Sequence, residues 1–183
     1  SIIKKDKTFF KNIKINAIKD FHDNSLYVKA CAKKINDYQK IKGKPDKLLF
    51  SFHGIPQSYI CDDEPYQTQC LRSADLIAEE LNISKSHYEV AFQSRFGKAE
   101  WIKPYLSSRL ETLPAEGIKN IHVFCPGFSS DCLETIDEIG RESKEEFFEH
   151  GGDYFEFIPC LNSEENFIEA LMDINSSEKI KIL

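Results

Sequence analysis

The 183-residue sequence lacks several features, and each absence argues against a class of protein. No apolar run approaches the roughly 18 residues that a membrane-spanning helix needs, and the start carries no hydrophobic region of a signal peptide. We therefore expect a cytoplasmic protein without a transmembrane segment. The net charge is −6, so a nucleic-acid partner held through phosphate contacts is not expected. No P-loop or GxGxxG motif is present, so the sequence gives no support for nucleotide binding.

Cysteine pairs of the CxxC type are also missing. In a chain of this length without a secretory signal, scattered cysteines favour reduced thiols, several of them in the core, over a disulfide framework. There are six: Cys31, Cys61, Cys70, Cys125, Cys132 and Cys160. The chain begins with Ser1 rather than Met, so we expect a processed or excised piece of a longer polypeptide.

What the sequence does contain is an alternation of strand and helix patterns. Four short apolar runs, rich in β-branched or aromatic residues, predict strands at 47–52, 88–92, 118–124 and 154–158. Segments with helical periodicity separate them, and a last helix is expected at 164–173. The pattern predicts a Rossmann-like, doubly wound α/β fold, in which a four-stranded parallel sheet has helices on both faces. We expect a linker and lead-in helix in 1–45, the α/β domain in 46–175 and a tail in 176–183.

Ligands of such sheets bind beyond the carboxyl ends of the strands, so the residues found there are the candidates for a site. The first strand runs into His53, where Gly54 allows the backbone to turn and Pro56 ends the ladder. From this pattern alone, a functional imidazole and a histidine satisfied by a backbone carbonyl remain equally open. The other histidines lie in surface-like segments or, for His122, inside a strand.

A helix that begins near Asp131 follows the third strand. At about 100° per residue it is expected to gather an apolar face: Leu133, Ile136, Ile139 and Phe147. A ridge of carboxylates spaced four apart runs beside this face: Glu134, Glu138 and Glu142. Asp131 and Glu134 also fit a capping box, and acidic ridges are usually solvated, so a structural interpretation of the ridge stays open.

His53 and Glu134 would face each other across the crevice at the carboxyl edge of the sheet. An imidazole opposite a carboxylate forms either a site for a borderline metal or an acid–base pair. The other glutamates of the ridge could carry protons or cations away from it. Trp101 and Phe128, which follow the second and third strands, would add flat apolar walls for a planar aromatic ligand.

Three segments carry a resemblance to a known family. LLFSFHGIP, FQSRFGKAEWIKPY and PGFSSDCLETIDEI resemble, in order, signature segments of the ferrochelatases, which insert ferrous iron into a porphyrin in haem synthesis. The resemblance extends over roughly 20–173 and includes HDNSLYVKACAKKI, which is similar to the helix leading into the second half of those enzymes. It implies a chelatase-like domain equivalent to the carboxyl-terminal one of two, with the porphyrin held between them. The amino-terminal domain would then be a missing partner.

The resemblance also implies roles for individual residues. His53 matches the family's active-site histidine and Glu134 its facing glutamate, which together bind the metal and accept the pyrrole protons. Glu138 and Glu142 match acidic positions that are implied to conduct metal or protons, on a helix that contains a π-type turn in the family. Trp101 matches an aromatic residue that contacts the porphyrin.

Ferrous iron is a substrate in this interpretation, and no cofactor is required. Some ferrochelatases hold a [2Fe-2S] cluster, but the spacing of Cys61, Cys70 and Cys160 does not favour one here. The porphyrin is protoporphyrin IX or coproporphyrin, and we do not expect the chain to be fully active by itself. Three alternatives remain: a cobalt chelatase for a sirohydrochlorin-like tetrapyrrole, a porphyrin- or metal-binding module without turnover, and a flavodoxin-like or response-regulator interaction domain.

Overall fold

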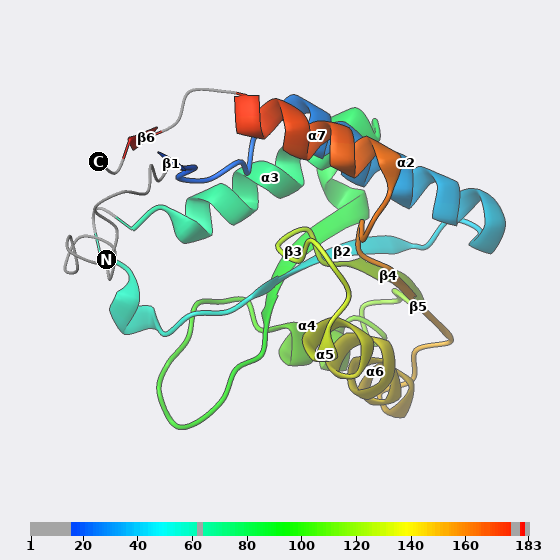
Figure 1. Ribbon diagram of the computed structural model, residues 1–183. Helices are drawn as coiled ribbons and strands as arrows, with labels where there is room; N and C mark the ends of the chain where they lie inside the picture. Colours follow the sequence, from blue (N-terminus) through cyan, green and yellow to red (C-terminus); the bar gives the residue numbers. More distant parts are fainter. Residues whose placement is uncertain (1–15, 62–63, 177–179, 182–183) are drawn as a thin grey trace.

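The computed structural model describes residues 16–61, 64–176 and 180–181, and its centre is one parallel sheet (Figure 1). The strands β2 (Lys47–His53), β3 (Tyr88–Gln93), β4 (Asn120–Phe124) and β5 (Tyr154–Ile158) lie in the order β3-β2-β4-β5. All three pairings are parallel, so β2 and β4 occupy the middle of the sheet. The predicted Rossmann-like α/β fold with four parallel strands is confirmed.

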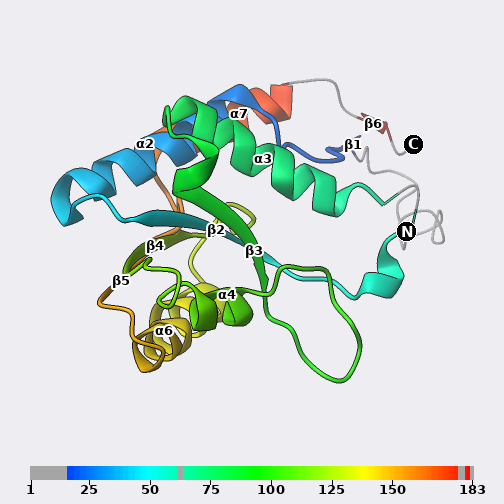
Figure 2. The same ribbon diagram turned by 180° about the vertical axis from the view of Figure 1, so that it is seen from behind.

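Helices cover both faces of the sheet (Figures 1 and 2). One face carries α2 (Ser25–Lys42), α3 (Tyr66–Glu80) and α7 (Glu165–Ser176). The other carries α4 (Leu106–Thr112), α5 (Leu133–Ile136), a π-helical segment (Glu138–Ser143) and α6 (Lys144–Glu149). Single 3-10 turns occupy Gln57–Tyr59 and Lys85–His87. Separately, β1 (Asn16–Ala17) pairs antiparallel with β6 (Ile180–Lys181).

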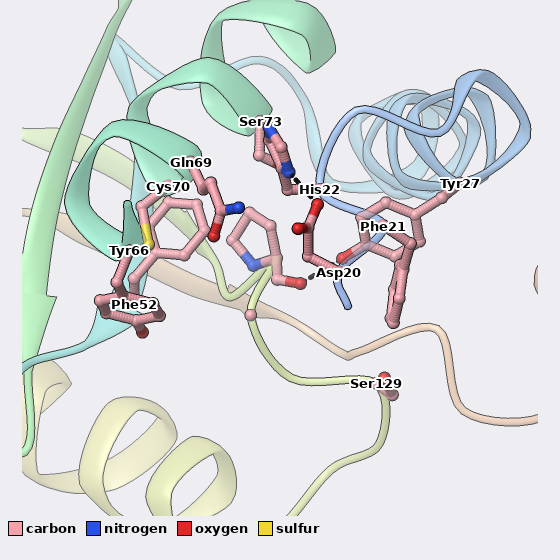
Figure 3. A pocket seen from close by; sticks show the side chains of 12 residues that line it. Asp20, Phe21, His22, Tyr27, Phe52, Tyr66, Gln69, Cys70, Ser73 and Ser129 are labelled. Carbon is pink, nitrogen blue, oxygen red and sulfur yellow. Dashed lines mark hydrogen bonds and ion pairs between the residues drawn. The ribbon is translucent and has the colours of Figure 1, made fainter. Parts of the chain in front are cut away.

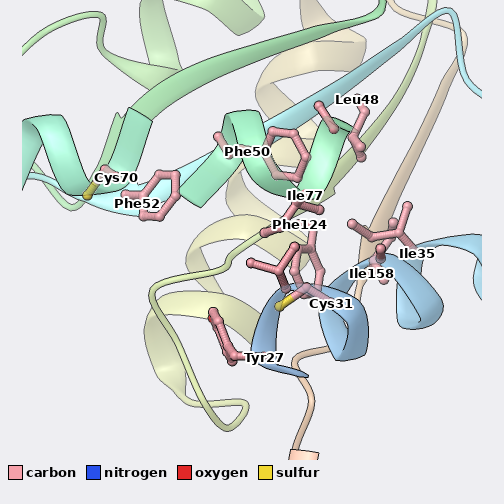
Figure 4. Close-up of a cluster of buried hydrophobic side chains, with 14 of the residues drawn as sticks. Tyr27, Cys31, Ile35, Leu48, Phe50, Phe52, Cys70, Ile77, Phe124 and Ile158 are labelled. Carbon is pink, nitrogen blue, oxygen red and sulfur yellow. The ribbon is translucent and has the colours of Figure 1, made fainter. Parts of the chain in front are cut away.

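The alternation of side chains along β2 decides which way its last residue points. Leu48, Phe50 and Phe52 pack into the hydrophobic cluster under α2, α3 and α7 (Figure 4), whereas Leu49 packs into the cluster on the opposite face. Successive side chains of a strand point to opposite faces. His53 therefore lies on the same face as Leu49, which is the face that carries α5 and the π-helical segment.

The lead-in helix α2 is part of this core, because Cys31 and Ile35 are fully buried against the sheet. The proposed division of the chain at residues 45 and 175 stays a prediction, and much of its two outer segments lies outside the described residues. Within the described ranges, no helix is long and apolar enough to cross a membrane.

The segment after β4 contains a π-helical turn, as the family resemblance implies, and so differs from the uniform helix that periodicity alone predicts. Ile139 and Phe147 are buried as predicted, but Leu133 is 75% exposed and Ile136 is 60% exposed, so the predicted apolar face is wrong over its first half. The reason is the π-helical segment, where the amide of Glu142 donates to the carbonyl of Asp137, five residues earlier. The wider turn changes the rotation per residue, and a constant 100° step no longer applies.

The expected capping box is formed by other residues. Cys132 is the N-cap of α5, and its backbone amide donates to the hydroxyl of Thr135 at 2.9 Å. Asp131 instead accepts hydrogen bonds from the amide of Cys160 and the side chain of Asn162. The pairing of Asp131 with Glu134 is therefore wrong, and Glu134 remains available for another role.

Candidate active site

His53 is held at the end of β2 by the backbone around it. Its Nδ1 lies 2.6 Å from the carbonyl oxygen of Gly54, and its own carbonyl accepts a hydrogen bond from the Tyr66 hydroxyl at 2.7 Å. A carbonyl oxygen can only accept, so Nδ1 carries the proton and Nε2 is the basic nitrogen. Within the described residues Nε2 makes no hydrogen bond. The imidazole is thus both satisfied by a carbonyl and able to bind a metal or a proton.

Two aromatic side chains lie beside this imidazole. The ring centroids of Trp101 and Phe128 are each 6.4 Å from that of His53, so the structure brings together three residues that the sequence placed after three different strands. Gly54 makes the contact with Trp101 possible. A Cβ at this position would lie 3.0 Å from the carbonyl oxygen of Gln93 and 3.1 Å from the Trp101 ring.

Glu134 opens α5 and is exposed. Its pKa is lowered, first by its own backbone amide, then by the Cys132 thiol, and to a smaller extent by the imidazole of His53. Helix amino-terminal amides favour a negative charge in this way. Glu134 is therefore ionised at neutral pH, on the helix that follows β4 at the carboxyl edge of the sheet.

Glu138 is more tightly held than the sequence indicated. Its carboxylate accepts hydrogen bonds from the Ser94 amide at 2.6 Å, the Ser94 hydroxyl at 2.7 Å and the Gln93 side chain at 3.3 Å. The same Nε2 of buried Gln93 donates to the carbonyl of Glu134 at 2.7 Å. Gln93, which pairs with His53 in the sheet register, thus links the end of β3 to the acidic helix. Sequence reasoning missed this residue, although its position opposite His53 was a usable signal.

Glu142 is exposed, and its Oε1 lies 3.0 Å from Nη2 of Arg141. It lines a cavity of about 190 Å³ together with Glu138, Ser94, Arg95 and Glu146. Glu146 also lines this cavity and continues the spacing of four, although it was not among the predicted residues. Burial raises the pKa of its carboxyl, Glu111 and Glu149 raise it further, and His150 opposes them. The predicted relay positions therefore share one acidic cavity.

A second cavity, of about 250 Å³, lies on the opposite face of the sheet (Figure 3). Aromatic side chains, among them Tyr27, Phe52 and Tyr66, line it together with Cys70, Asp20 and His22. Burial raises the pKa of the Cys70 thiol to about 12, so this thiol is protonated at neutral pH.

The three cysteines considered for an iron–sulfur cluster differ in their exposure to solvent. Cys61 is exposed, while Cys70 and Cys160 are buried. Among the described residues, the one group of three possible metal ligands that lie close together is Asp20, His22 and Asp23, with no cysteine in it. Absence of an iron–sulfur cluster stays a prediction.

Comparison with known proteins gives this arrangement a family. The model of the family described as Ferrochelatase matches residues 2–179. A ferrochelatase of Idiomarina loihiensis is 46% identical over 157 residues, which cover 86% of this chain and 43% of that protein. A ferrochelatase of Hydrogenovibrio crunogenus is also 46% identical, and the match covers 86% of this chain and 42% of that protein. A ferrochelatase of Aliivibrio fischeri is 44% identical over 161 residues, which cover 88% of this chain and 50% of that protein.

The chain thus spans half or less of the length of these relatives. The family match nevertheless covers nearly all of its residues and includes every candidate site residue described above. The chain belongs to the ferrochelatase family.

Proposed function

We propose that this chain provides the metal- and proton-handling side of a ferrochelatase, which inserts ferrous iron into a porphyrin. The main support is the setting of His53 at the carboxyl end of β2, where Nδ1 is hydrogen-bonded to the Gly54 carbonyl and the rings of Trp101 and Phe128 lie beside the imidazole. Further support comes from Glu134 at the start of α5, whose lowered pKa keeps its carboxylate ionised at neutral pH. Family membership agrees with this assignment.

The reaction requires groups of this kind. As ferrous iron enters, two pyrrole N–H bonds break and iron–nitrogen bonds form, so two protons leave and no electron is transferred. His53 Nε2 and the Glu134 carboxylate accept protons and serve as transient metal ligands. His53 is suited to this step because its Nδ1–H donates to the Gly54 carbonyl, which fixes the tautomer and leaves Nε2 as the nitrogen that can accept a proton or a metal.

Glu138 and Glu142 are proposed to pass protons or metal ions between this pair and solvent. Both line the acidic cavity, and Glu142 is exposed while Glu138 is half-buried. Iron and porphyrin are substrates in this proposal. The region of the relatives that this chain does not match would supply the other wall of the porphyrin site, and a cytoplasmic location remains our expectation.

The test uses the chain joined to the region of the Idiomarina loihiensis relative that it does not match, called the joined enzyme below. Ferrous iron and protoporphyrin IX are mixed with it without oxygen, and haem formation is followed by the Soret shift. We expect the parent to form haem and His53→Ala to abolish the reaction, because no other group replaces Nε2. The matched control is His87→Ala, which removes an exposed histidine at the amino ends of the strands.

Near-normal iron insertion by His53→Ala would overturn the proposal. If the parent binds porphyrin without a Soret shift on adding iron, the chain is a binding module instead. Faster insertion of cobalt into sirohydrochlorin than of iron into protoporphyrin would favour the cobalt chelatase.

A further inference from the structure

Trp101 is enclosed by protein on nearly all sides. Its side chain is 4% exposed, and its Nε1 is buried without a hydrogen-bond partner in the part of the chain that the structure describes. One neighbour is His53, and another is Phe96, whose ring centroid lies 5.0 Å from that of Trp101 in an edge-to-face arrangement. The indole therefore has little surface left with which to contact a ligand.

Phe96 is the opposite case, because its side chain is 73% exposed. Fully burying a phenylalanine side chain stabilises by about 1.5–3 kcal/mol relative to leaving it in water. A ligand that covers the exposed ring of Phe96 would therefore gain binding free energy. The loop holds the ring outward. Ser94 and Gly97, on either side of Phe96, adopt positive φ angles of 63° and 71°.

The start of this loop is anchored by contacts of two successive residues. Ser94 is a non-glycine residue in the left-handed region, and Glu138 binds both its amide and its hydroxyl. Arg95 stacks over the ring of Tyr105 at 4.6 Å from the centroid. The backbone that leads into Phe96 is thus held by Glu138 and Tyr105.

Other exposed apolar side chains follow another strand, β4, at the carboxyl edge of the sheet. Leu133 and Ile136, the residues on either side of Glu134 on α5, are also largely exposed. Exposed apolar side chains therefore flank both the loop beside His53 and the helix that carries Glu134. A flat apolar macrocycle over the two proposed catalytic groups would cover such side chains.

We propose that Phe96, and not Trp101, is the aromatic surface that this chain presents to the porphyrin, and that Trp101 is a positioning residue which supports both Phe96 and His53. The inference rests on the proposed function, since the macrocycle is the substrate assigned there. Trp101 was predicted to contact the porphyrin. In this proposal it instead packs against Phe96 and His53 and holds them in place.

Protoporphyrin IX is titrated into the 183-residue chain, and its Soret band gives the Kd. Quenching of Trp101, the single tryptophan, gives a second signal from the same place. We expect Phe96→Ala to raise the Kd about ten-fold, from the loss of one stacked ring and its burial. Phe96→Leu should have a smaller effect. The control is Phe148→Ala, which removes a partly exposed ring from α6.

Steady-state kinetics of the joined enzyme separate the two residues. Phe96→Ala should raise the porphyrin KM and leave kcat within about two-fold, since it removes binding that is equal in ground and transition states. Trp101→Ala should also lower kcat because His53 loses its support, and Trp101→Phe should restore most of it.

An unchanged Kd in Phe96→Ala, with the parent binding porphyrin, would overturn this inference and leave the proposed function standing. If the parent chain and the joined enzyme both fail to bind porphyrin, the proposed function fails, and this inference fails with it.

Discussion

Replacing His122 should remove a large part of the protein's loss of stability between pH 7.5 and pH 5. The imidazole is 1% exposed, lies between Tyr38 and Tyr154 with ring centroids 6.0 and 6.2 Å away, and leaves Nδ1 unpaired within the described residues. Burial lowers its pKa from 6.5 to about 4, while Glu156 opposes the shift and Lys42 adds to it.

The sign and size of the effect follow from proton linkage. Below pH 6.5 the unfolded chain binds a proton at this histidine that the folded protein does not, so acid favours unfolding until the pH falls to about 4. With these two values, the loss on going from pH 7.5 to pH 5 is about 2 kcal/mol of unfolding free energy. Carboxyl groups with lowered pKa values, such as Glu89 and Glu156, protonate mainly below this window.

The assay is urea unfolding at the two pH values, followed by the fluorescence of Trp101. His122→Gln should lose about 2 kcal/mol less than the parent between them, whatever its stability at pH 7.5. His87→Gln, the exposed control, should behave like the parent. Equal losses in the parent and in His122→Gln would refute the idea that this buried imidazole resists protonation.

Two further changes test the active site and its packing. Glu134→Gln should lower kcat of the joined enzyme by at least about two orders of magnitude, as expected for loss of a positioned proton acceptor, and a loss of less than about ten-fold would contradict its role. Gly54→Ala should cost about 1–3 kcal/mol in urea unfolding, because the new Cβ would press on Trp101 and the Gln93 carbonyl. The control is Gly140→Ala, because a Cβ at that position would make only ordinary van der Waals contacts. Equal losses of stability in the two variants would show that the crowding at Gly54 is relieved without cost.

The sequence was sufficient to predict how His53 reaches the edge of the sheet. Unbroken apolar character at Leu48, Leu49 and Phe50 is typical of a strand covered on both faces, and β2 is such a strand at the centre of a parallel sheet. Because parallel strands end at one edge, the residues after each strand could be grouped before the structure was known. That local pattern, repeated in four strands, was enough to predict the fold class.

Exposure around Glu134 could not be predicted from periodicity, although the family resemblance did imply a π-type turn on this helix. Periodicity assumes one rotation per residue, and the π-helical segment after α5 breaks that assumption, so Leu133 and Ile136 point outward instead of into the core. The burial of Trp101 was equally hidden. It depends on the space left by Gly54 and on the bridge between Pro56 and Trp101, which join parts of the chain some 45 residues apart.

The same long-range contacts connect two parts of the proposed mechanism that the sequence presents separately. Glu138 belongs to the acidic ridge, but its carboxylate also fixes Ser94, the residue that begins the loop carrying Phe96. Gln93 ties the loop to the backbone of Glu134 as well. A shift of the acidic helix on metal or proton uptake would therefore be felt at the porphyrin-facing ring, and removing the Glu138 carboxylate should weaken porphyrin binding as well as proton transfer. A pure relay residue would alter only the latter.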